Sequence, residues 1–235
     1  MDNMTTRVIS SFITSKRNEE KFIIDRSLLP LIRRELKPFI VIDPNGIDNG
    51  SYSVQSLYFD DSSHNNYFDK INGNESREKS RVRFYNFDPT QLRFETKSKF
   101  KKESWKAVTS VKDSHFKFSY RNLMALADEV GEKAEQFKKL TPILAISYQR
   151  QAFVSQNPSQ NVRVTIDEKI ISSKNISQLF KYRMGTRTQE DLAIVEIKVA
   201  PGLTPGWLMH IKKNLLIQSS YSKYIEAFNQ QQIRV

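Results

Sequence analysis

The sequence predicts an α+β protein built on an antiparallel β-sheet or barrel with flanking helices. Seven or eight segments combine β-branched and aromatic residues with flanking turn formers, and a few others repeat apolar residues at helical spacing. No internal repeat, Pro-rich linker or low-complexity segment interrupts the 235 residues. We therefore expect one domain over residues 16–235, preceded by a flexible leader over residues 1–15.

The first half of the chain supplies five of the expected strands and one helix. Residues 17–25 are expected to form the first strand, and Ser27 to cap a short helix that ends at Leu36. After a loop of turn formers at residues 43–50, four more strands are expected over residues 51–60, 78–87, 91–99 and 103–111. The second and third of these four predict a hairpin joined by the Asp-Pro-Thr at residues 88–90.

The second half begins with a helix and then returns to strands. Residues 120–140 place apolar side chains at helical spacing, at Leu123, Leu126, Ala127, Val130, Ala134 and Phe137. Further strands are expected over residues 142–154, 162–168 and 192–199, followed by closing helices over residues 204–216 and 222–230. This order of elements supports the α+β class.

Composition excludes several classes of protein. With 38% hydrophobic and 11% aromatic residues the chain can bury a sizeable core, so global disorder is not expected. No apolar run exceeds five residues and the N-terminus lacks an apolar signal region, so we expect a cytoplasmic protein without a transmembrane segment. The absence of cysteine excludes disulfides, zinc fingers and a thiol nucleophile, and the three histidines lie far apart in sequence.

The charge of the chain indicates a polyanionic partner. Lysine and arginine number 37 against 26 acidic residues, which leaves a formal net charge of +11. Residues 77–106 hold ten basic and four acidic residues, so more than half of the excess lies in this segment. Apolar residues are interleaved with these charges, which favours folded strands over a disordered basic tail.

Charged residues alternate along five of the expected strands, which places them on one face of each strand. The shared faces hold Glu19 and Lys21; Arg81 and Arg83; Arg93, Glu95, Lys97 and Lys99; Arg163 and Asp167; and Glu196 and Lys198. One interpretation is that each charged face is the solvent side of a sheet. The other is that a barrel directs these faces inward and makes a basic channel with a few carboxylates. Because an empty channel of like charges is costly, it would hold a polyanion or a metal–anion complex, as a phosphoryl-transfer site does.

Eight short segments, taken in order, resemble one known family. They are EEK at residues 19–21, YSVQSLYFD at 52–60, SRVRFY at 80–85, FETK at 94–97 with Lys106 after it, SYQRQAF at 147–153, VRVTID at 162–167, VEIKV at 195–199 and YSKY at 221–224. Together they are similar to the VTC domain, the catalytic domain of the vacuolar transporter chaperone polyphosphate polymerases, in the triphosphate tunnel metalloenzyme (CYTH-like) superfamily. The resemblance extends from Arg17 to Tyr224.

This resemblance implies a fold, a cofactor and a set of site residues. The family has an eight-stranded antiparallel β tunnel with flanking helices, which binds polyphosphate and ATP together with Mn²⁺ or Mg²⁺. Matching positions imply a catalytic set of Arg81, Arg83, Lys97, Arg150 and Arg163. They imply further phosphate contacts from Lys21, Lys106, Lys198, Ser222 and Lys223. Glu196 matches the metal-binding glutamate, and Glu95 and Glu19 are further metal candidates whose alternative role is to orient lysines through ion pairs.

The sequence leaves three functions open for such a tunnel. The leading one is ATP-dependent polyphosphate synthesis, in which the γ-phosphate passes to a chain grown from pyrophosphate or polyphosphate. The second is hydrolysis of a triphosphate, for which Glu19, Glu95 or Asp167 would position water. The third is a polyanion-binding module without activity. No P-loop, dinucleotide-binding motif or recognised nucleic-acid module is present, so a specific nucleic-acid partner is not expected, and a membrane-protein partner for export stays open.

Overall fold

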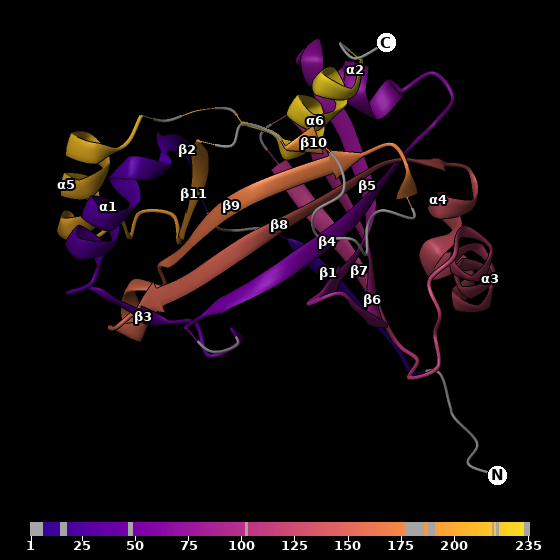
Figure 1. Ribbon diagram of the computed structural model, residues 1–235, viewed down its shortest axis with the longest axis horizontal. Helices are drawn as coiled ribbons and strands as arrows, with labels where there is room; N and C mark the ends of the chain where they lie inside the picture. The colour runs from indigo at the N-terminus through magenta and orange to yellow at the C-terminus, as the bar shows by residue number, and fades with distance from the viewer. Residues whose placement is uncertain are drawn as a thin grey trace.

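One antiparallel sheet forms the frame of the protein (Figure 1). The computed structural model describes residues 7–14, 18–46, 49–101, 103–176, 186–187, 191–217, 219 and 221–232. Nine strands follow one another in the order β1-β7-β6-β5-β4-β8-β9-β11-β2, while β3 pairs with β8 and β10 with β9. With its flanking helices, this antiparallel sheet confirms the predicted α+β class.

The elements are short to medium in length and alternate irregularly along the chain. The strands are β1 Arg7–Thr14, β2 Asn18–Asp25, β3 Ile40–Ile42, β4 Ser51–Asp60, β5 Ser76–Tyr85, β6 Asp88–Phe100, β7 Glu103–Lys112, β8 Thr141–Ser155, β9 Arg163–Ser173, β10 Thr186–Arg187 and β11 Leu192–Val199. The helices are α1 Leu29–Leu36, α2 Asn65–Ile71, α3 Tyr120–Val130, α4 Glu135–Lys138, α5 Gly206–Leu215 and α6 Lys223–Gln232. None of the described helices is long and apolar enough to span a lipid bilayer.

The start of the chain differs from the sequence prediction. Residues 1–15 are predicted to be a flexible leader, whereas Arg7–Thr14 form strand β1 and pair along their whole length with β7. The predicted cap of the first helix also differs. Asp25, not Ser27, caps the 3₁₀ turn before α1, because its side chain accepts a hydrogen bond of 2.8 Å from the backbone N–H of Ser27.

The hairpin between β5 and β6 turns two residues earlier than predicted. Tyr85 pairs with Asp88, so the connecting residues are Asn86 and Phe87, both with positive φ (53° and 58°). Two central residues with positive φ are typical of a type I′ turn, the turn whose twist matches that of paired strands. Residues 88–90, predicted as the turn, therefore begin strand β6.

The sheet carries one more strand along its path than the predicted eight-stranded tunnel. β1 occupies the edge beside β7, and among the described residues no backbone pairing closes β1 onto β2 at the other edge. Side chains nevertheless cross between distant strands, because Lys97 of β6 contacts Glu19 of β2 at 3.5 Å. The described sheet is therefore open at its edges, yet the inner faces of β2 and β6 meet.

Helices cover the outer face of the sheet at two places and its inner face at one. α1 and α5 pack on β2, β9 and β11, where Ile32 and Leu208 join one apolar cluster. α3 and α4 pack on β4, β5 and β6, with Phe137 fully buried among them. α6 packs on the inner side, where the rings of Tyr58 and Tyr224 stack at 5.2 Å. The remaining inner face is left to polar and charged side chains.

Strand alternation separates the apolar core from the charges. In β5, Val82 and Phe84 are buried in the cluster beneath α3, whereas Arg81 and Arg83 line a cavity on the other face. The same alternation in β11 buries Ile197 outside and directs its charged neighbours inward. The sequence pattern of apolar and basic residues thus fixes which face of the sheet becomes the site.

Candidate active site

The inner face of the sheet lines an open cavity of about 1500 Å³. Fourteen basic and five acidic side chains line it, an excess of nine positive charges in a chain whose formal net charge is +11. The basic side chains are Lys21, Lys70, Arg77, Lys79, Arg81, Arg83, Arg93, Lys97, Lys99, Lys106, Arg150, Arg163, Lys198 and Lys223. Such a concentration of one sign of charge attracts a polyanion.

The residues that the sequence assigns to the catalytic, phosphate-binding and metal sets all line this cavity, whereas Asp167, a candidate to position water, is buried behind it. The basic members come from β2, β5, β6, β7, β8, β9, β11 and the start of α6, so segments far apart in sequence converge. The residues are Lys21, Arg81, Arg83, Glu95, Lys97, Lys106, Arg150, Arg163, Glu196, Lys198, Ser222 and Lys223. Their placement agrees with the inward interpretation of the alternating charges.

Glu95 is held by three cations at the centre of β6. Its side chain is 2% exposed, and one oxygen accepts from Arg81 at 2.6–2.7 Å while the other accepts from Lys106 at 2.6 Å. Arg83 lies 3.8 Å away. Burial alone would raise the pKa of Glu95, but the three cations lower it by more and hold it well below its usual range. Glu95 therefore stays ionised and keeps Arg81 and Lys106 in place.

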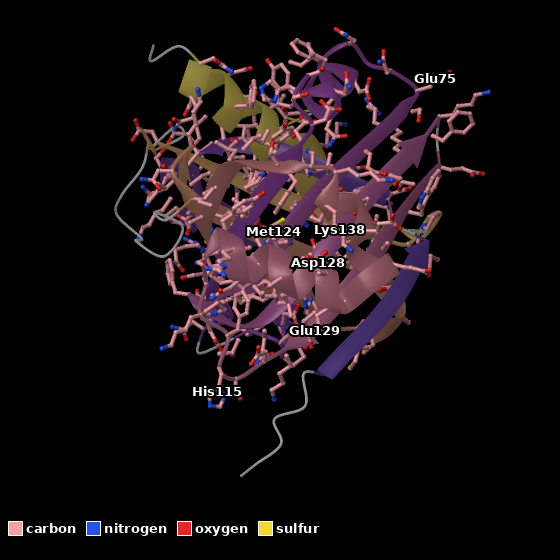
Figure 2. All side chains as sticks on the ribbon, turned by 90° about the vertical axis from the view of Figure 1, so that its right-hand side faces the viewer. Glu75, His115, Met124, Asp128, Glu129 and Lys138 are labelled. Atoms are coloured by element: carbon pink, nitrogen blue, oxygen red, sulfur yellow. The ribbon has the colours of Figure 1, made fainter. Side chains whose placement is uncertain are left out.

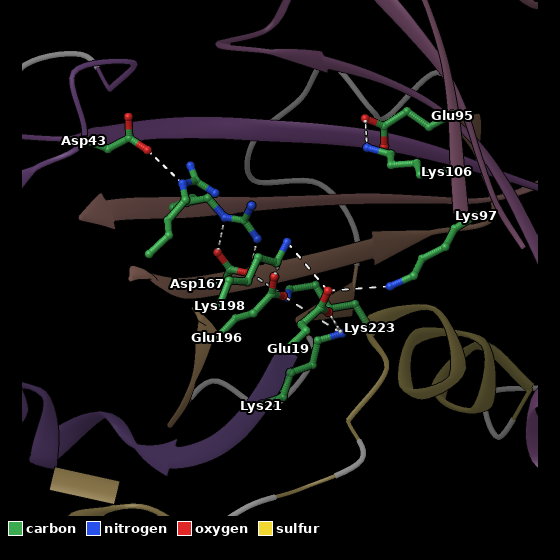
Figure 3. Close-up of polar contacts among 12 residues, drawn as sticks. Glu19, Lys21, Asp43, Glu95, Lys97, Lys106, Asp167, Glu196, Lys198 and Lys223 are labelled. Carbon is green, nitrogen blue, oxygen red and sulfur yellow. Dashed lines mark hydrogen bonds and ion pairs between the residues drawn. The ribbon is translucent and has the colours of Figure 1, made fainter. Parts of the chain in front are cut away.

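Glu19 and Glu196 form a second carboxylate group together with two lysines (Figure 3). Lys198 contacts Glu196 at 2.9 Å and Glu19 at 3.6 Å, while Lys21 contacts Glu19 at 3.1 Å and Glu196 at 4.0 Å. Burial raises the pKa of each carboxyl group, but the neighbouring lysines outweigh it and lower both values. The lowering is large for Glu196. Both groups are therefore carboxylates at neutral pH.

Asp167 ties the last helix to the middle of the sheet. It is fully buried and accepts a bidentate pair from Arg150, at 2.6 and 2.8 Å, while Lys223 of α6 contacts its second oxygen at 2.6 Å. Arg163 makes a similar contact, at 2.8 Å, with Asp43 in the loop after β3. These ion pairs fix the direction of the guanidinium groups before any ligand binds.

Comparison with known proteins covers the part of the chain that forms the cavity. The model of a protein family described as the VTC domain matches residues 16–231. The chain belongs to the VTC-domain family. No curated protein matches it. Among solved structures it is similar to the PH1819 protein of Pyrococcus horikoshii OT3, at 12% identity and a TM-score of 0.48, over 91% of this chain and 99% of that one. A putative adenylyl cyclase of Hippeastrum, described as having a dominant triphosphatase activity, is similar at 15% identity and a TM-score of 0.48, over 90% of this chain and 95% of that one.

Two carboxylates of this VTC domain fit a divalent cation. Glu19 and Glu196 contact the same two lysines, which places the two carboxylates in one cluster on the cavity wall. Mg²⁺ at phosphate sites is typically held by one or two carboxylates together with substrate phosphates. Within the described part of the chain, no three acidic or histidine side chains form a complete metal site. Glu95 fits less well, because Arg81 and Lys106 hold its two oxygens at 2.6 Å, whereas the lysine contacts of Glu19 and Glu196 are longer, from 2.9 to 4.0 Å.

Five cations on the cavity differ from the other nine. Among the residues that the structure describes, none of these five has a carboxylate oxygen within 4.0 Å, whereas each of the others has one. The five are Lys70, Arg77, Lys79, Arg93 and Lys99. Sequence alternation accounts for four of them: Arg93 and Lys99 lie on the charged face predicted along β6, and Arg77 and Lys79 continue the alternation of Arg81 and Arg83 along β5.

Lys138 is an example of a basic residue on the outer surface, away from the cavity. Lys138 of α4 contacts Asp128 of α3 at 3.0 Å, and both lie on the helical face turned toward the viewer in Figure 2. Lys138 does not line the cavity. It is therefore a suitable reference for the basic residues inside.

Proposed function

We propose that this VTC domain is an ATP-dependent polyphosphate polymerase, which moves the γ-phosphate of ATP onto a growing chain of inorganic phosphate. The observation that supports it is the cavity itself, with fourteen basic side chains from nine helices and strands facing one shared space. A linear chain of phosphates can contact many of these groups at once, whereas a single phosphate contacts only a few. Electrostatic stabilisation of this kind is the main requirement of phosphoryl transfer.

The arginines at the centre hold the reacting phosphates. Arg81 and Arg150 are each fixed by a carboxylate, so they offer their remaining N–H donors in one direction. Burial alone would lower the pKa of both, but the nearby carboxylates and tyrosines raise it above its usual value, and both stay cationic. Fixed cations of this kind align donor and acceptor phosphates and spread the charge that develops between them.

Transfer to a phosphate requires no general base, because the attacking oxygen is already anionic. The described lining of the cavity contains no histidine. Four of its five carboxyl groups, Glu19, Asp43, Glu95 and Glu196, have lowered pKa values, which makes them weak bases. Asp167 has both oxygens engaged by cations. These features favour a phosphate acceptor over water and therefore synthesis over hydrolysis.

Glu19 and Glu196 would hold the divalent cation, Mn²⁺ or Mg²⁺, together with phosphate oxygens of the substrate. A cation bound there would neutralise part of the negative charge on the phosphoryl group that is transferred. Lys21 and Lys198, which pair with the two carboxylates in the free protein, then have donors available for the phosphates beside them.

The test is a synthesis assay with purified protein, ATP, Mn²⁺ or Mg²⁺ and a pyrophosphate primer, followed by electrophoresis of the product. A ladder of phosphate polymers is expected. Orthophosphate as the only product would identify a triphosphatase instead. The absence of both products, with polyphosphate still bound, would identify a binding module.

A further inference from the structure

Asp60, the last residue of β4, anchors the first turns of two helices. Its side chain is fully buried and does not line the cavity. One oxygen accepts hydrogen bonds from the backbone N–H groups of Asp61 at 2.9 Å and Asn66 at 3.0 Å. The other accepts from the backbone N–H of Tyr67 at 3.1 Å and from the hydroxyl of Tyr224 at 2.6 Å. This carboxylate therefore ties the start of α2 and the start of α6 to the same point of the sheet.

The first turn of α6 braces two strands that are not neighbours. The hydroxyl of Tyr224 ties the helix to β4 through Asp60. The preceding residue, Lys223, contacts Asp167 of β9 at 2.6 Å, and β8 lies between these two strands in the sheet. Asp167 also holds the guanidinium of Arg150. The position of this turn therefore affects one of the central arginines as well as Lys223 itself.

The ring of Tyr224 supports the other central arginine. It stacks on Tyr58 at 5.2 Å, and the hydroxyl of Tyr58 accepts a hydrogen bond of 3.2 Å from Arg81. Burial and the hydrogen bond to Asp60 both raise the pKa of Tyr224 above its usual value. The Tyr224 hydroxyl therefore stays protonated and donates to the carboxylate.

We propose that Tyr224, anchored by Asp60, is a positioning residue for phosphate binding, which holds the ammonium of Lys223 where the ligand binds. The inference rests on the proposed function in that it takes a chain of phosphates as the ligand. A lysine side chain is long and flexible, so ordering it on a ligand costs conformational entropy. A fixed backbone at the start of α6 lowers that cost, because Lys223 already points into the cavity in the free protein.

A double-mutant cycle measured by calorimetric titration with tripolyphosphate tests this proposal. Tyr224→Phe removes only the hydroxyl and keeps the ring that stacks on Tyr58, and it should weaken binding on the order of fivefold. Lys223→Met keeps the length of the side chain and removes the ammonium. In the Lys223→Met background, Tyr224→Phe should weaken binding by less than about twofold more, because its effect passes through Lys223.

The matched control is Tyr67→Phe. The Tyr67 hydroxyl donates to Asn229 and joins α2 to α6, which lie side by side at the top of Figure 1, but Tyr67 does not line the cavity. Its loss should lower stability in urea unfolding much as Tyr224→Phe does, and leave the affinity for tripolyphosphate unchanged.

Three results would overturn the proposal. They are native affinity in Tyr224→Phe, an equal loss in Tyr67→Phe, and a loss from Tyr224→Phe that persists in full without the Lys223 ammonium. The last would show that the hydroxyl acts on the ligand by another route, and the second that any loosening of the two helices weakens binding. A missing polymer ladder in the synthesis assay bears on the proposed function alone, because the titration measures binding.

Discussion

Glu196 combines two features that distinguish a metal ligand from a structural ion pair. It is nearly buried, and it faces a second carboxylate, Glu19, through shared lysines. Glu196→Gln keeps the size of the side chain but removes the charge that would hold the cation. We expect turnover in the synthesis assay to fall on the order of a hundredfold, with tripolyphosphate binding by calorimetry unchanged because the basic residues remain.

The control for this variant is Glu168→Gln, the same change in a carboxylate that pairs with Arg33 at 2.8 Å outside the cavity. It should leave turnover near that of the native protein. If Glu196→Gln instead costs about 1 kcal/mol of unfolding free energy and keeps most of its activity, Glu196 serves only as an ion-pair partner.

Lys106 gives phosphate binding a dependence on pH. Burial lowers its pKa, Glu95 raises it, and the nearby arginines lower it again, to about 8. Lys106 is therefore cationic below that pH and neutral above it, so its attraction for phosphate is present at neutral pH and lost as pH rises through 8. Each pH unit above the pKa should weaken binding by up to about tenfold from this one group.

Lys106→Arg tests this dependence because arginine keeps its charge over the whole range. Titration of native and variant protein with tripolyphosphate at pH 7 and pH 9.5 cancels the ionisation of the ligand itself. The variant should lose less affinity between the two values. Equal losses would show that Lys106 does not titrate in this range or does not contact phosphate.

At the level of single residues, the sequence predicts which residues line the cavity better than it predicts which of them form ion pairs with one another. Alternation along strands is enough to direct Arg81, Lys97 and Glu196 to one face. It carries no information about Asp43, whose contact with Arg163 spans 120 positions, or about Lys70, which lies on a helix outside the pattern. Such contacts depend on how distant segments meet, and that is decided by the whole sheet.

At the level of elements, the turn between β5 and β6 controls the register of the central arginines. Asn86 accepts a hydrogen bond of 2.9 Å from the backbone N–H of Ser53 while holding a positive φ. Asn86→Gly loses the hydrogen bond but adopts this φ at no steric cost, whereas Asn86→Ala loses the bond and is also strained. In urea unfolding, alanine should therefore be less stable than glycine by about 1 kcal/mol. Equal stabilities would mean that the left-handed conformation costs nothing here.

The same hairpin shows which elements sequence patterns can locate. β4 and β11 have the predicted bounds because their β-branched and aromatic runs are long and flanked by turn formers. The turn at Asn86 and Phe87 was predicted two residues too late, since the Asp-Pro-Thr that follows is a stronger turn signal than Asn-Phe. β1 and α2 lack strong periodic signals and form where the neighbouring strands β7 and β5 provide partners.

At the level of the whole molecule, the fold concentrates like charges that the unfolded chain would keep apart. The cavity holds nine more positive than negative side chains, and repulsion among them makes the empty state less stable. The ion pairs of Glu95, Asp167 and Glu196 offset part of this cost. The net charge of the sequence indicates that like charges repel, but only the arrangement of the strands shows that these charges share one cavity.

Tripolyphosphate should therefore stabilise the folded protein more than its ionic strength alone would. A ligand that binds only the folded state adds about 2.7 kcal/mol at a hundredfold excess over its Kd, which for a domain of this size raises the melting temperature by several degrees. Sulfate at matched ionic strength should give a much smaller shift, because only a linear ligand contacts cations on several strands together.

The same measurement on variants separates a site from general screening of charge. Arg81→Ala and Arg163→Ala remove cavity residues from β5 and β9, strands far apart in sequence, and each should reduce the shift caused by tripolyphosphate. Lys138→Ala, on the outer helical face, should leave it intact. Sulfate and tripolyphosphate giving equal shifts, or all three variants behaving alike, would mean that the ligand screens a diffuse cationic surface. A shift specific to tripolyphosphate and to the two cavity arginines requires that distant strands bind one chain of phosphates together.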